Sequence, residues 1–429
     1  MTRISRPHFR LAFAICALLS TLLLAACGGT SPASSDHVTL TFGWWSNGPQ
    51  HDQEFAKWAE SFTKTHPNIT IKSEFLPFGD YFTKLQTTAA AGKAYDVIGQ
   101  CSCNVAPYYA NQQMVDLSTF SDFKASTSDI DPGAVQTDTY NGHPYGMPLG
   151  VAARVIGYNK ALFAAAGIAE PDPTKPLTLS EFTQLAKKLT VVSNGKMTQA
   201  GLFTGLDQDA SYLPEFFAEN QGVSLFDNYV NPQKVTINSP AGIKALTDYQ
   251  ALWKQNIEPS IDDNSWQAGL AGLQSNRVAM TISGPWEFSQ FDTSKYGVMP
   301  IPVSDAGKHM QRMTINSLSI YSGSQHKAEA WEFLKWAAQA PQQQQYAAFA
   351  DTPVNKTAFA NSNTIIKPAS FYPTLQVEAT NIRPYLLSSK TQLTTTITNI
   401  LQDLIRGKIS PTDAASQLEQ QGNSVLAGN

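Results

Sequence analysis

The sequence predicts an α/β protein with two lobes, each a mainly parallel sheet flanked by helices. Strand patterns alternate with helix patterns from residue 38 onward, as they do in βαβ units. The chain has 429 residues. About 400 of them would remain after removal of an N-terminal leader, which is more than one hydrophobic core usually serves. We therefore expect two cores.

The first 26 residues predict a signal peptide. Arg3, Arg6 and Arg10 precede an apolar run that is short for a membrane span. Small residues then lead to Cys27, as in the lipobox of bacterial lipoproteins, so we expect cleavage before Cys27 and a diacylglycerol on its thiol. An ordinary signal peptide that happens to contain this cysteine is the alternative. Residues 27–37 would form a flexible, lipidated tether that holds the protein at the extracytoplasmic face of the cell membrane.

The charge and composition exclude some classes of partner. The chain has 30 basic and 34 acidic residues, and loss of the three leader arginines leaves a formal charge of −7 (27 minus 34). No basic patch is visible along the sequence, which argues against nucleic acid as a partner. Charged residues make up only 15% of the chain and aromatic residues 10%, a balance that fits a neutral polar ligand. No cofactor motif, zinc pattern, nucleophile elbow or phosphate loop is present.

The first predicted lobe begins with a strand of period two. Val38, Leu40 and Phe42 share one face, and the strand ends in a loop that contains Trp44 and Trp45. In parallel sheets, ligands bind beyond the carboxyl ends of the strands, so the loops after the first and third strands are candidate ligand loops. The expected elements are a strand over 38–42, a helix through 55–62, a strand over 69–75, a helix over 80–91 and a strand over 95–99.

An extended segment over 143–160 is expected to cross to the second lobe. Ser180 is the predicted N-cap of a helix with an apolar face. Further predicted elements are helices over 241–255, 266–273 and 327–340, strands over 277–283, 296–302 and 314–323, and a last helix near 410–421. The predicted boundaries assign 38–150 plus about 284–328 to the first lobe, and about 151–283 plus 329–429 to the second.

In their order and spacing these segments resemble the extracellular solute-binding proteins of carbohydrate ABC transporters, the group that contains the maltose-binding protein. The resemblance runs through nearly all of the mature chain. It implies a Venus-flytrap fold, a monomer that captures a di- or oligosaccharide without catalysis, and an ABC permease that recognises the closed form. The matching pieces include VTLTFGWWS, YGMPLGVAARVIGYNKALFAAAG, SNRVAMTISGPWEF and AEAWEFLKWAAQ.

The resemblance places aromatic residues at the sugar. Trp286 occupies the Gly-Pro-Trp loop of the family's stacking tryptophan, with a core position as the alternative. Of Trp44 and Trp45, one should face the cleft and the other pack, with Ser46 beside them as a hydroxyl partner. Tyr212 and Trp266 match cleft positions or pack in the core. Four other tryptophans lie on apolar helical stripes and are expected in the core: Trp58, Trp253, Trp331 and Trp336.

Polar residues of the cleft follow from the same resemblance. The loops that line the cleft in relatives contain Asn316, Ser317, Asp351 and Arg383 here. Gln100 and Cys103 stand where the maltose-binding protein has an aromatic residue and an aspartate. Ala152, with Arg154 nearby, replaces a glutamate of that relative. The identity of the sugar therefore does not carry over.

Cys101 and Cys103 flank one serine. No other His or Cys joins them at the spacing of a zinc site, so no metal is expected. An oxidising exterior permits a disulfide. Residues two apart span up to ~7 Å, and a disulfide needs about 4.4–6.8 Å between Cα atoms, so a bridge can form where the loop bends.

Three alternative functions remain open from the sequence. Arg154 and Arg383 could serve a glycerol-phosphate or phosphodiester ligand. A secreted glycoside hydrolase would need two carboxylates, and Glu215 and Glu219 lie at helical spacing, although such a pair usually marks a solvated face. A surface lipoprotein with an adhesive or chaperone role is the third.

Overall fold

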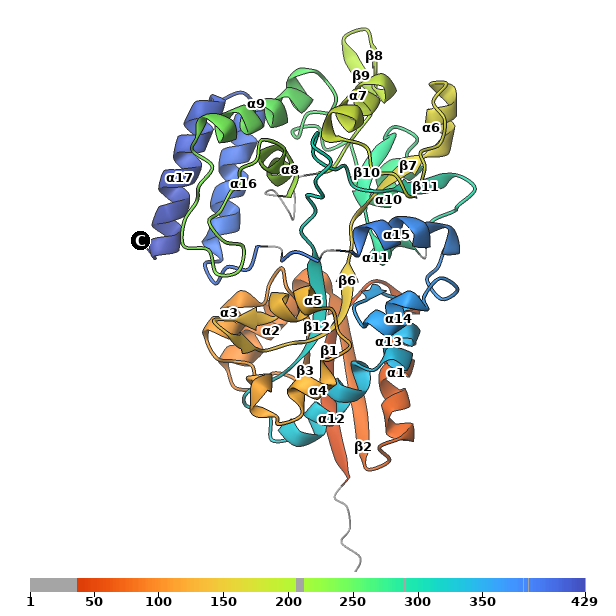
Figure 1. Cartoon of the computed structure of the whole chain (residues 1–429), viewed down its shortest axis with the longest axis vertical. Helices are drawn as coiled ribbons and strands as arrows, with labels where there is room; N and C mark the ends of the chain where they lie inside the picture. The colour runs from red at the N-terminus through yellow and green to blue at the C-terminus, as the bar shows by residue number, and fades with distance from the viewer. Residues whose placement is uncertain (1–36, 206–211, 289, 381, 385, 429) are drawn as a thin grey trace, which may run out of the picture. The chain divides into compact units, whose positions relative to one another are not determined.

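The computed structural model describes residues 37–205, 212–288, 290–380, 382–384 and 386–428 (Figure 1). The predicted signal peptide, the lipidation site Cys27 and the tether up to residue 36 lie outside the described residues. The chain from Val38 onward forms one compact unit. Within the described ranges, no helix combines the length and apolar character that crossing a bilayer requires.

A six-stranded sheet organises the first lobe. Its strand order is β13-β6-β12-β3-β1-β2. β1 is parallel to β2 and β3, whereas β12 is antiparallel to both of its neighbours, β3 and β6. The strands are β1 (Val38–Ser46), β2 (Ile69–Pro77), β3 (Val97–Cys101), β6 (Met147–Ala152), β12 (Thr314–Ile320) and β13 (Thr352–Pro353).

A three-stranded sheet organises the second lobe, in the order β10-β7-β11. The expected mainly parallel arrangement is wrong for this sheet, because β10 and β11 are both antiparallel to β7. Met280 pairs with Tyr158 and Tyr296 with Asn159, so both strands begin beside the C-terminal end of β7. The strands are β7 (Val155–Asn159), β10 (Met280–Ser283) and β11 (Tyr296–Met299).

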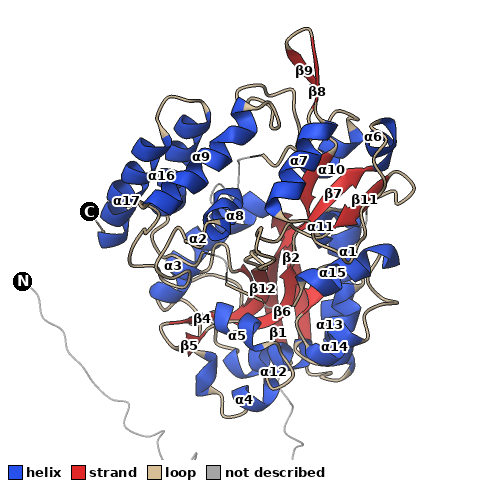
Figure 2. Ribbon diagram, turned by 45° about the horizontal axis from the view of Figure 1, so that its top comes forward, coloured by secondary structure: helices blue, strands red, loops and turns tan. Residues whose placement is uncertain are grey.

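Helices cover both sheets, as the α/β class predicts (Figure 2). Two-stranded ribbons are formed by β4 (Thr139–Tyr140) with β5 (His143–Pro144) and by β8 (Val191–Ser193) with β9 (Lys196–Gln199). The helices are α1 (Pro49–Glu60), α2 (Phe78–Ala90), α3 (Ala106–Ala110), α4 (Phe123–Ser126), α5 (Pro132–Thr137), α6 (Lys160–Ala165), α7 (Leu179–Leu189), α8 (Tyr212–Asn220), α9 (Pro240–Lys254), α10 (Gly269–Gln274), α11 (Pro285–Phe288), α12 (Lys327–Ala337), α13 (Ala340–Ala347), α14 (Lys356–Ala360), α15 (Tyr372–Glu378), α16 (Gln392–Ile405) and α17 (Pro411–Ala427).

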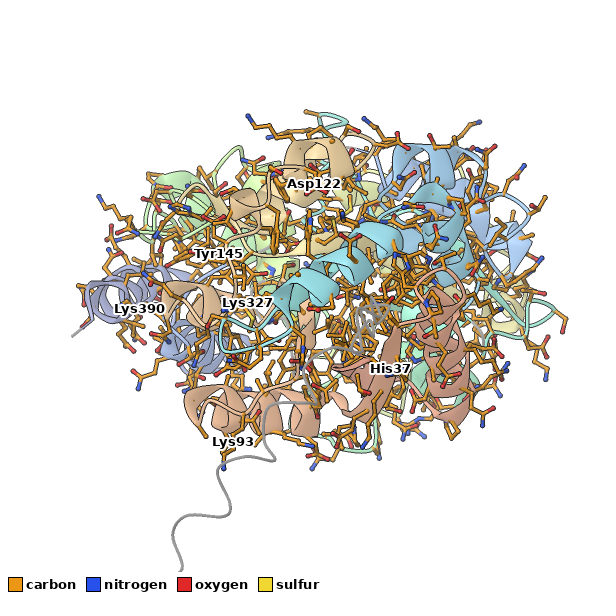
Figure 3. All side chains as sticks on the ribbon, turned by 90° about the horizontal axis from the view of Figure 1, so that it is seen from below. His37, Lys93, Asp122, Tyr145, Lys327 and Lys390 are labelled. Atoms are coloured by element: carbon orange, nitrogen blue, oxygen red, sulfur yellow. A yellow bond between two sulfur atoms is a disulfide. The ribbon has the colours of Figure 1, made fainter. Side chains whose placement is uncertain are left out.

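The apolar residues form two large clusters. Three of the four tryptophans expected in the core, Trp58, Trp331 and Trp336, are buried in the first cluster. The fourth, Trp253, is partly buried and packs against the second cluster. Asp122 lies against α12, where its carboxylate accepts hydrogen bonds from Trp331 Nε1 (2.8 Å) and Lys335 Nζ (3.0 Å) (Figure 3).

The strand pairing differs from the predicted lobe boundaries in two places. β11 lies within the segment assigned to the first lobe, yet it pairs with β7 in the second sheet. β13 lies within the segment assigned to the second lobe, yet it pairs with β6 in the first sheet. The reason is that β12 returns the chain to the centre of the first sheet, and α12 and α13 then pack on that sheet's core.

The start of α7 also differs from the prediction by two residues. Thr178, and not Ser180, is the N-cap, because its Oγ accepts a hydrogen bond from Glu181 N while Glu181 Oε2 accepts one from Thr178 N. This reciprocal capping box satisfies two helix-end donors. Ser180 instead donates from both N and Oγ to Asp305 (2.9 and 2.8 Å).

Candidate functional site

The two tryptophans at the end of β1 stack on each other, with ring centroids 4.3 Å apart. Trp44 is 1% exposed and packs on Phe55. Trp45 is 5% exposed, because the rings of Phe78 and Phe82 on α2 lie against it. We expected one ring in the core and one toward the cleft; here both rings are buried, and Trp44 is the more enclosed of the two.

Ser46 lies at the junction of β1 and α1. Its Oγ donates a hydrogen bond to Asp52 Oδ2 (2.6 Å) and accepts one from Gly48 N (3.1 Å). Both contacts hold the turn that leads into the helix. A ligand hydroxyl would therefore compete with Asp52 for this serine.

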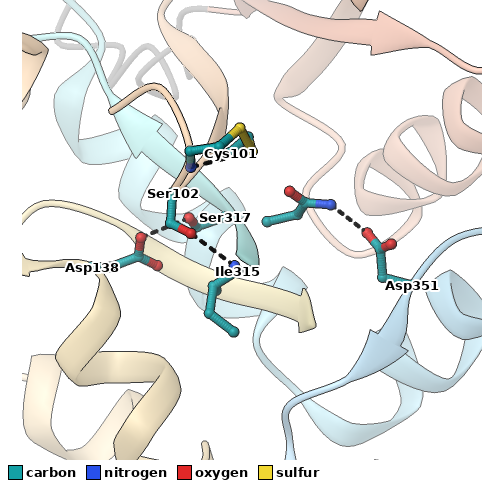
Figure 4. Close-up of a disulfide and its surroundings, with 8 residues drawn as sticks. Cys101, Ser102, Asp138, Ile315, Ser317 and Asp351 are labelled. Atoms are coloured by element: carbon teal, nitrogen blue, oxygen red, sulfur yellow. Dashed lines mark hydrogen bonds between the residues drawn. A yellow bond between two sulfur atoms is a disulfide. The ribbon is translucent and has the colours of Figure 1, made fainter. Parts of the chain in front are cut away.

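Cys101 and Cys103 form a disulfide, with 5.1 Å between their Cα atoms (Figure 4). The bridge considered from the sequence is thus present. Ser102 between them fastens the loop to β12, since its N donates to Ile315 O (2.8 Å) and its Oγ accepts from Ile315 N (2.9 Å). The loop after β3 is consequently held by one covalent bond and two hydrogen bonds.

Gln100 and Ser317 are paired across β3 and β12, and both are fully buried. Ser317 Oγ donates to Asp138 Oδ1 (3.0 Å) (Figure 4). Tyr109 OH lies 3.5 Å from the same oxygen. Neither amide atom of Gln100 has a hydrogen-bond partner among the described residues. Complete burial raises the pKa of the Asp138 carboxyl to about 7. Gln100 and Ser317 thus belong to a buried polar cluster in this structure.

Asn316 and Asp351, predicted separately, contact each other. Asp351 Oδ2 accepts a hydrogen bond from Asn316 Nδ2 (2.7 Å) (Figure 4). It also accepts one from Tyr346 OH (2.7 Å). Burial raises the pKa of the Asp351 carboxyl, although these two donors act in the opposite direction. Asp351 lines a small cavity of about 30 Å³, and Pro285 of α11 lies on the wall of the same cavity.

Trp286 follows Pro285 on α11 and is partly exposed. Its ring lies directly over Gly284, where an added Cβ would come within 2.1 Å of a ring carbon. Glu287 fixes the short helix by accepting from Ser283 Oγ (2.6 Å). Trp286 is therefore a partly exposed ring packed over Gly284, and its neighbour Pro285 shares a cavity wall with Asp351.

Trp266 is packed in a structural position. It is 8% exposed, its Nε1 donates to Asp263 Oδ2 (3.1 Å), and the guanidinium of Arg277 lies 4.0 Å from its ring centroid. These contacts favour the core alternative for Trp266. Tyr212 begins α8, but its side chain lies outside the described residues.

Glu215 and Glu219 are buried, so the expectation of a solvated helix face is wrong. They are 4% and 5% exposed. Arg312 Nη2 bonds Glu219 Oε1 (3.0 Å), and Arg312 Nε lies 3.5 Å from Glu215 Oε1. Arg383 also binds Glu219, with Nη1 2.8 Å from Oε2. Burial raises the pKa of Glu215 to about 7.

This ion-pair cluster changes the expected role of Arg383. Both terminal nitrogens of its guanidinium contact Glu219, and Nη1 also reaches His309 O (3.3 Å). The charge of Arg383 is therefore already matched by a carboxylate. A phosphate ester would have to displace Glu219 to bind Arg383.

A cavity of about 880 Å³ lies outside the residues predicted from the sequence. Its wall combines Arg312, Pro384, the segment around β4 and the loop over 224–233. Asn231 spans it, accepting from Tyr140 OH (3.3 Å) and donating to Asn141 Oδ1 (3.1 Å). No periodicity or motif marks these loop residues, so only the tertiary structure reveals the cavity. Among the described residues, no group of three or more His, Cys, Asp or Glu could hold a metal ion.

The fold and site define an extracellular solute-binding protein with two α/β lobes. The family of bacterial extracellular solute-binding proteins matches residues 45–344, which is well over half of the chain. The chain therefore belongs to this family, whose members act outside the cytoplasmic membrane.

Curated relatives are distant but cover most of the chain. An uncharacterised lipoprotein of Streptomyces antibioticus is 27% identical over 334 residues, or 76% of this chain and 71% of the relative. The multiple sugar-binding protein of Streptococcus mutans is 23% identical over 365 residues, or 78% of this chain and 80% of the relative.

Solved structures share the fold. An ABC substrate-binding protein of Listeria monocytogenes, in complex with cycloalternan, superimposes with a TM-score of 0.75 at 23% identity, covering 91% of this chain and 100% of that one. The GacH receptor of Streptomyces glaucescens, solved unliganded and with acarbose, gives a TM-score of 0.70 at 24% identity, covering 91% and 98%. These likenesses confirm the predicted two-lobed α/β fold.

Proposed function

We propose that this protein is the substrate-binding component of an ABC importer and captures a di- or oligosaccharide for delivery to the permease. The family match over residues 45–344 carries this proposal. Relatives named for multiple-sugar and maltodextrin binding support carbohydrate as the ligand class.

Trp286 and the Asn316–Asp351 pair are the residues that we assign to the sugar. A pyranose needs a flat apolar ring for its C–H face and polar side chains for its hydroxyls. Trp286 supplies a partly exposed ring, and Asp351 is a buried acceptor on the wall of the neighbouring cavity. A ligand lacking the matching hydroxyl would leave such a buried group unpaired, which is the source of selectivity.

The experiment is isothermal titration with a panel of maltose, mannobiose, acarbose and glycerol 3-phosphate. Trp286→Ala should lower sugar affinity by roughly 30-fold or more, as loss of a central aromatic contact does. Trp253→Ala, which removes a partly buried tryptophan of α9, is the matched control and should leave affinity unchanged. Equal affinity of Trp286→Ala and wild type would remove Trp286 from the site.

The ligand class is tested separately by thermal unfolding. A ligand present at 100 times its Kd adds about 2.7 kcal/mol to the free energy of unfolding. A shift with glycerol 3-phosphate and none with any sugar would overturn the carbohydrate proposal. Release of cleaved products from the sugar panel, detected by chromatography, would contradict capture without catalysis.

We also propose that Cys27 carries the lipid anchor and that the mature protein is a monomer at the outer face of the membrane. The lipobox pattern before Cys27 and the lipoprotein relative support the anchor. Mass spectrometry of the membrane fraction should find a diacylglyceryl group on an N-terminal Cys27. Recovery of Cys27→Ser in the membrane fraction as fully as wild type would contradict the anchor.

A further inference from the structure

The β8–β9 ribbon projects beyond α7 (Figures 1 and 2). It also carries exposed apolar side chains. Val191 and Val192 are 46% and 49% exposed, and they are the large apolar side chains that stand exposed in the described part of the chain. A two-residue turn closes the ribbon, with Asn194 and Gly195 at φ values of 51° and 75°. These positive values give a turn whose twist matches the flanking strands, so the ribbon presents its valines on a defined scaffold.

Lysines flank these two valines, which lie at the base of the ribbon and not at its turn. Residues 182–206 contain three lysines and no acid, in a chain that is otherwise acidic. Lys187 and Lys188 end α7, and Lys196 begins β9 opposite Ser193. All three side chains are exposed. Lys187 and Lys188 precede the two valines, and Lys196 lies beside the turn at the far end of the ribbon.

The nearby acids do not cancel this charge. None of the three lysines forms an ion pair with a carboxylate in the described ranges, and Lys187 Nζ bonds the neutral Gln255 Oε1 (3.3 Å). Asp263 is close enough to Lys196 for their charges to interact, but its carboxylate accepts from Ser265 N (3.0 Å) and Trp266 Nε1 (3.1 Å). The ribbon thus carries two exposed valines at its base, with lysines before them on α7 and another lysine beside the turn.

We propose that the β8–β9 ribbon docks on a lipid bilayer that contains anionic headgroups. Valine side chains gain by entering the interfacial region, and lysines around them are attracted to anionic lipids while their ammonium groups stay in the headgroup layer. The negative charge of the rest of the chain repels the same surface, so this patch would set the orientation of the protein. A tether to the membrane would raise the local concentration, so a weak contact suffices.

The test uses residues 38–429, which form a compact unit of their own, without leader or tether. Co-sedimentation is measured with vesicles of phosphatidylcholine alone and with one-third phosphatidylglycerol. We expect binding only to the anionic vesicles, weakened by added salt. Lys187→Gln/Lys188→Gln/Lys196→Gln should lower the partition coefficient by roughly 100-fold, at about fivefold per lysine.

Two further variants separate the contribution of the valines from that of lysines elsewhere on the protein. Val191→Thr/Val192→Thr keeps side-chain shape and strand propensity while it removes the exposed apolar groups, and it should also weaken binding. Lys64→Gln/Lys72→Gln/Lys93→Gln removes three exposed lysines of the first lobe and should bind like wild type. Circular dichroism checks that each variant is folded.

Three results would overturn the proposal. The first is no sedimentation with anionic vesicles, and the second is equal binding by the ribbon variants and wild type. The third is unchanged vesicle binding by ribbon variants that lose sugar uptake in cells, which would identify a protein as the partner.

Discussion

Asp138→Asn tests whether the buried acid beside β12 is protonated in the folded protein. Asp138 is fully buried, its Oδ1 lies near the hydroxyls of Ser317 and Tyr109, and its Oδ2 has no partner among the described residues. An ionised carboxylate there would be desolvated with little compensation. Asparagine keeps the accepting oxygen and nearly the same shape, but it never ionises.

The pKa of Asp138 determines the sign and size of its contribution to the pH dependence of the free energy of unfolding. Its value is about 7 in the folded protein, compared with about 3.9 in an unfolded chain. Between these two pH values the folded state holds a proton that the unfolded state releases, so the free energy of unfolding falls as pH rises. The full loss is roughly 4 kcal/mol, of which about 3 kcal/mol occurs between pH 5 and pH 8.

The assay is urea unfolding of wild type and Asp138→Asn at pH 5 and pH 8. Relative to wild type, the variant should gain about 3 kcal/mol of stability between the two pH values. Other buried acids with raised pKa values, such as Glu258 and Glu378, contribute equally to both proteins. Asp80→Asn, an exposed change on α2, is the control. It should alter the change in the free energy of unfolding between pH 5 and pH 8 by less than about 0.5 kcal/mol. The reasoning would be refuted if wild type and Asp138→Asn differed in free energy of unfolding by the same amount at both pH values.

Three other predictions concern packing, the ion-pair cluster and the disulfide. Gly99→Ala places a Cβ 2.2 Å from the Trp44 ring and should lower the free energy of unfolding by about 1–3 kcal/mol. Gly79→Ala, with open space around it, is the control and should not destabilise the protein. Equal denaturation midpoints for the two variants would contradict the packing at β1. Glu219→Ala should cost about 3–5 kcal/mol, because it leaves Arg312 and Arg383 without their shared carboxylate. Glu60→Ala, an exposed change at the end of α1, is its control, and a loss no greater than that of the control would argue against the cluster. Alkylation of unreduced, unfolded protein should leave Cys101 and Cys103 unlabelled, and mass spectrometry showing two labelled thiols would exclude the bridge.

Local patterns predicted most elements of the first lobe. The alternation of Val38, Leu40 and Phe42 correctly indicated β1, because one face of that strand is buried and the other is not. The helical stripe with Phe55 and Trp58 likewise became α1. These predictions succeed because side-chain period depends on backbone geometry alone.

Residues whose role depends on distant partners were harder to predict. Glu215 and Glu219 have the spacing of a solvated helix face, yet Arg312 and Arg383, about 90 and 160 residues further on, bury and pair them. The enclosure of Trp45 similarly depends on the rings that α2 places over it. Local spacing has no information about such partners.

By itself, then, the sequence determined the α/β class, the closeness of the two cysteines and the resemblance to solute-binding proteins, and it predicts the leader with Cys27. Only the tertiary structure decided which sheet β11, β12 and β13 join, which polar groups are buried and that Val191 and Val192 stand exposed on a ribbon. The physical reason is that a residue's own neighbours set its backbone conformation, whereas burial and charge pairing depend on segments that meet only after the chain has folded.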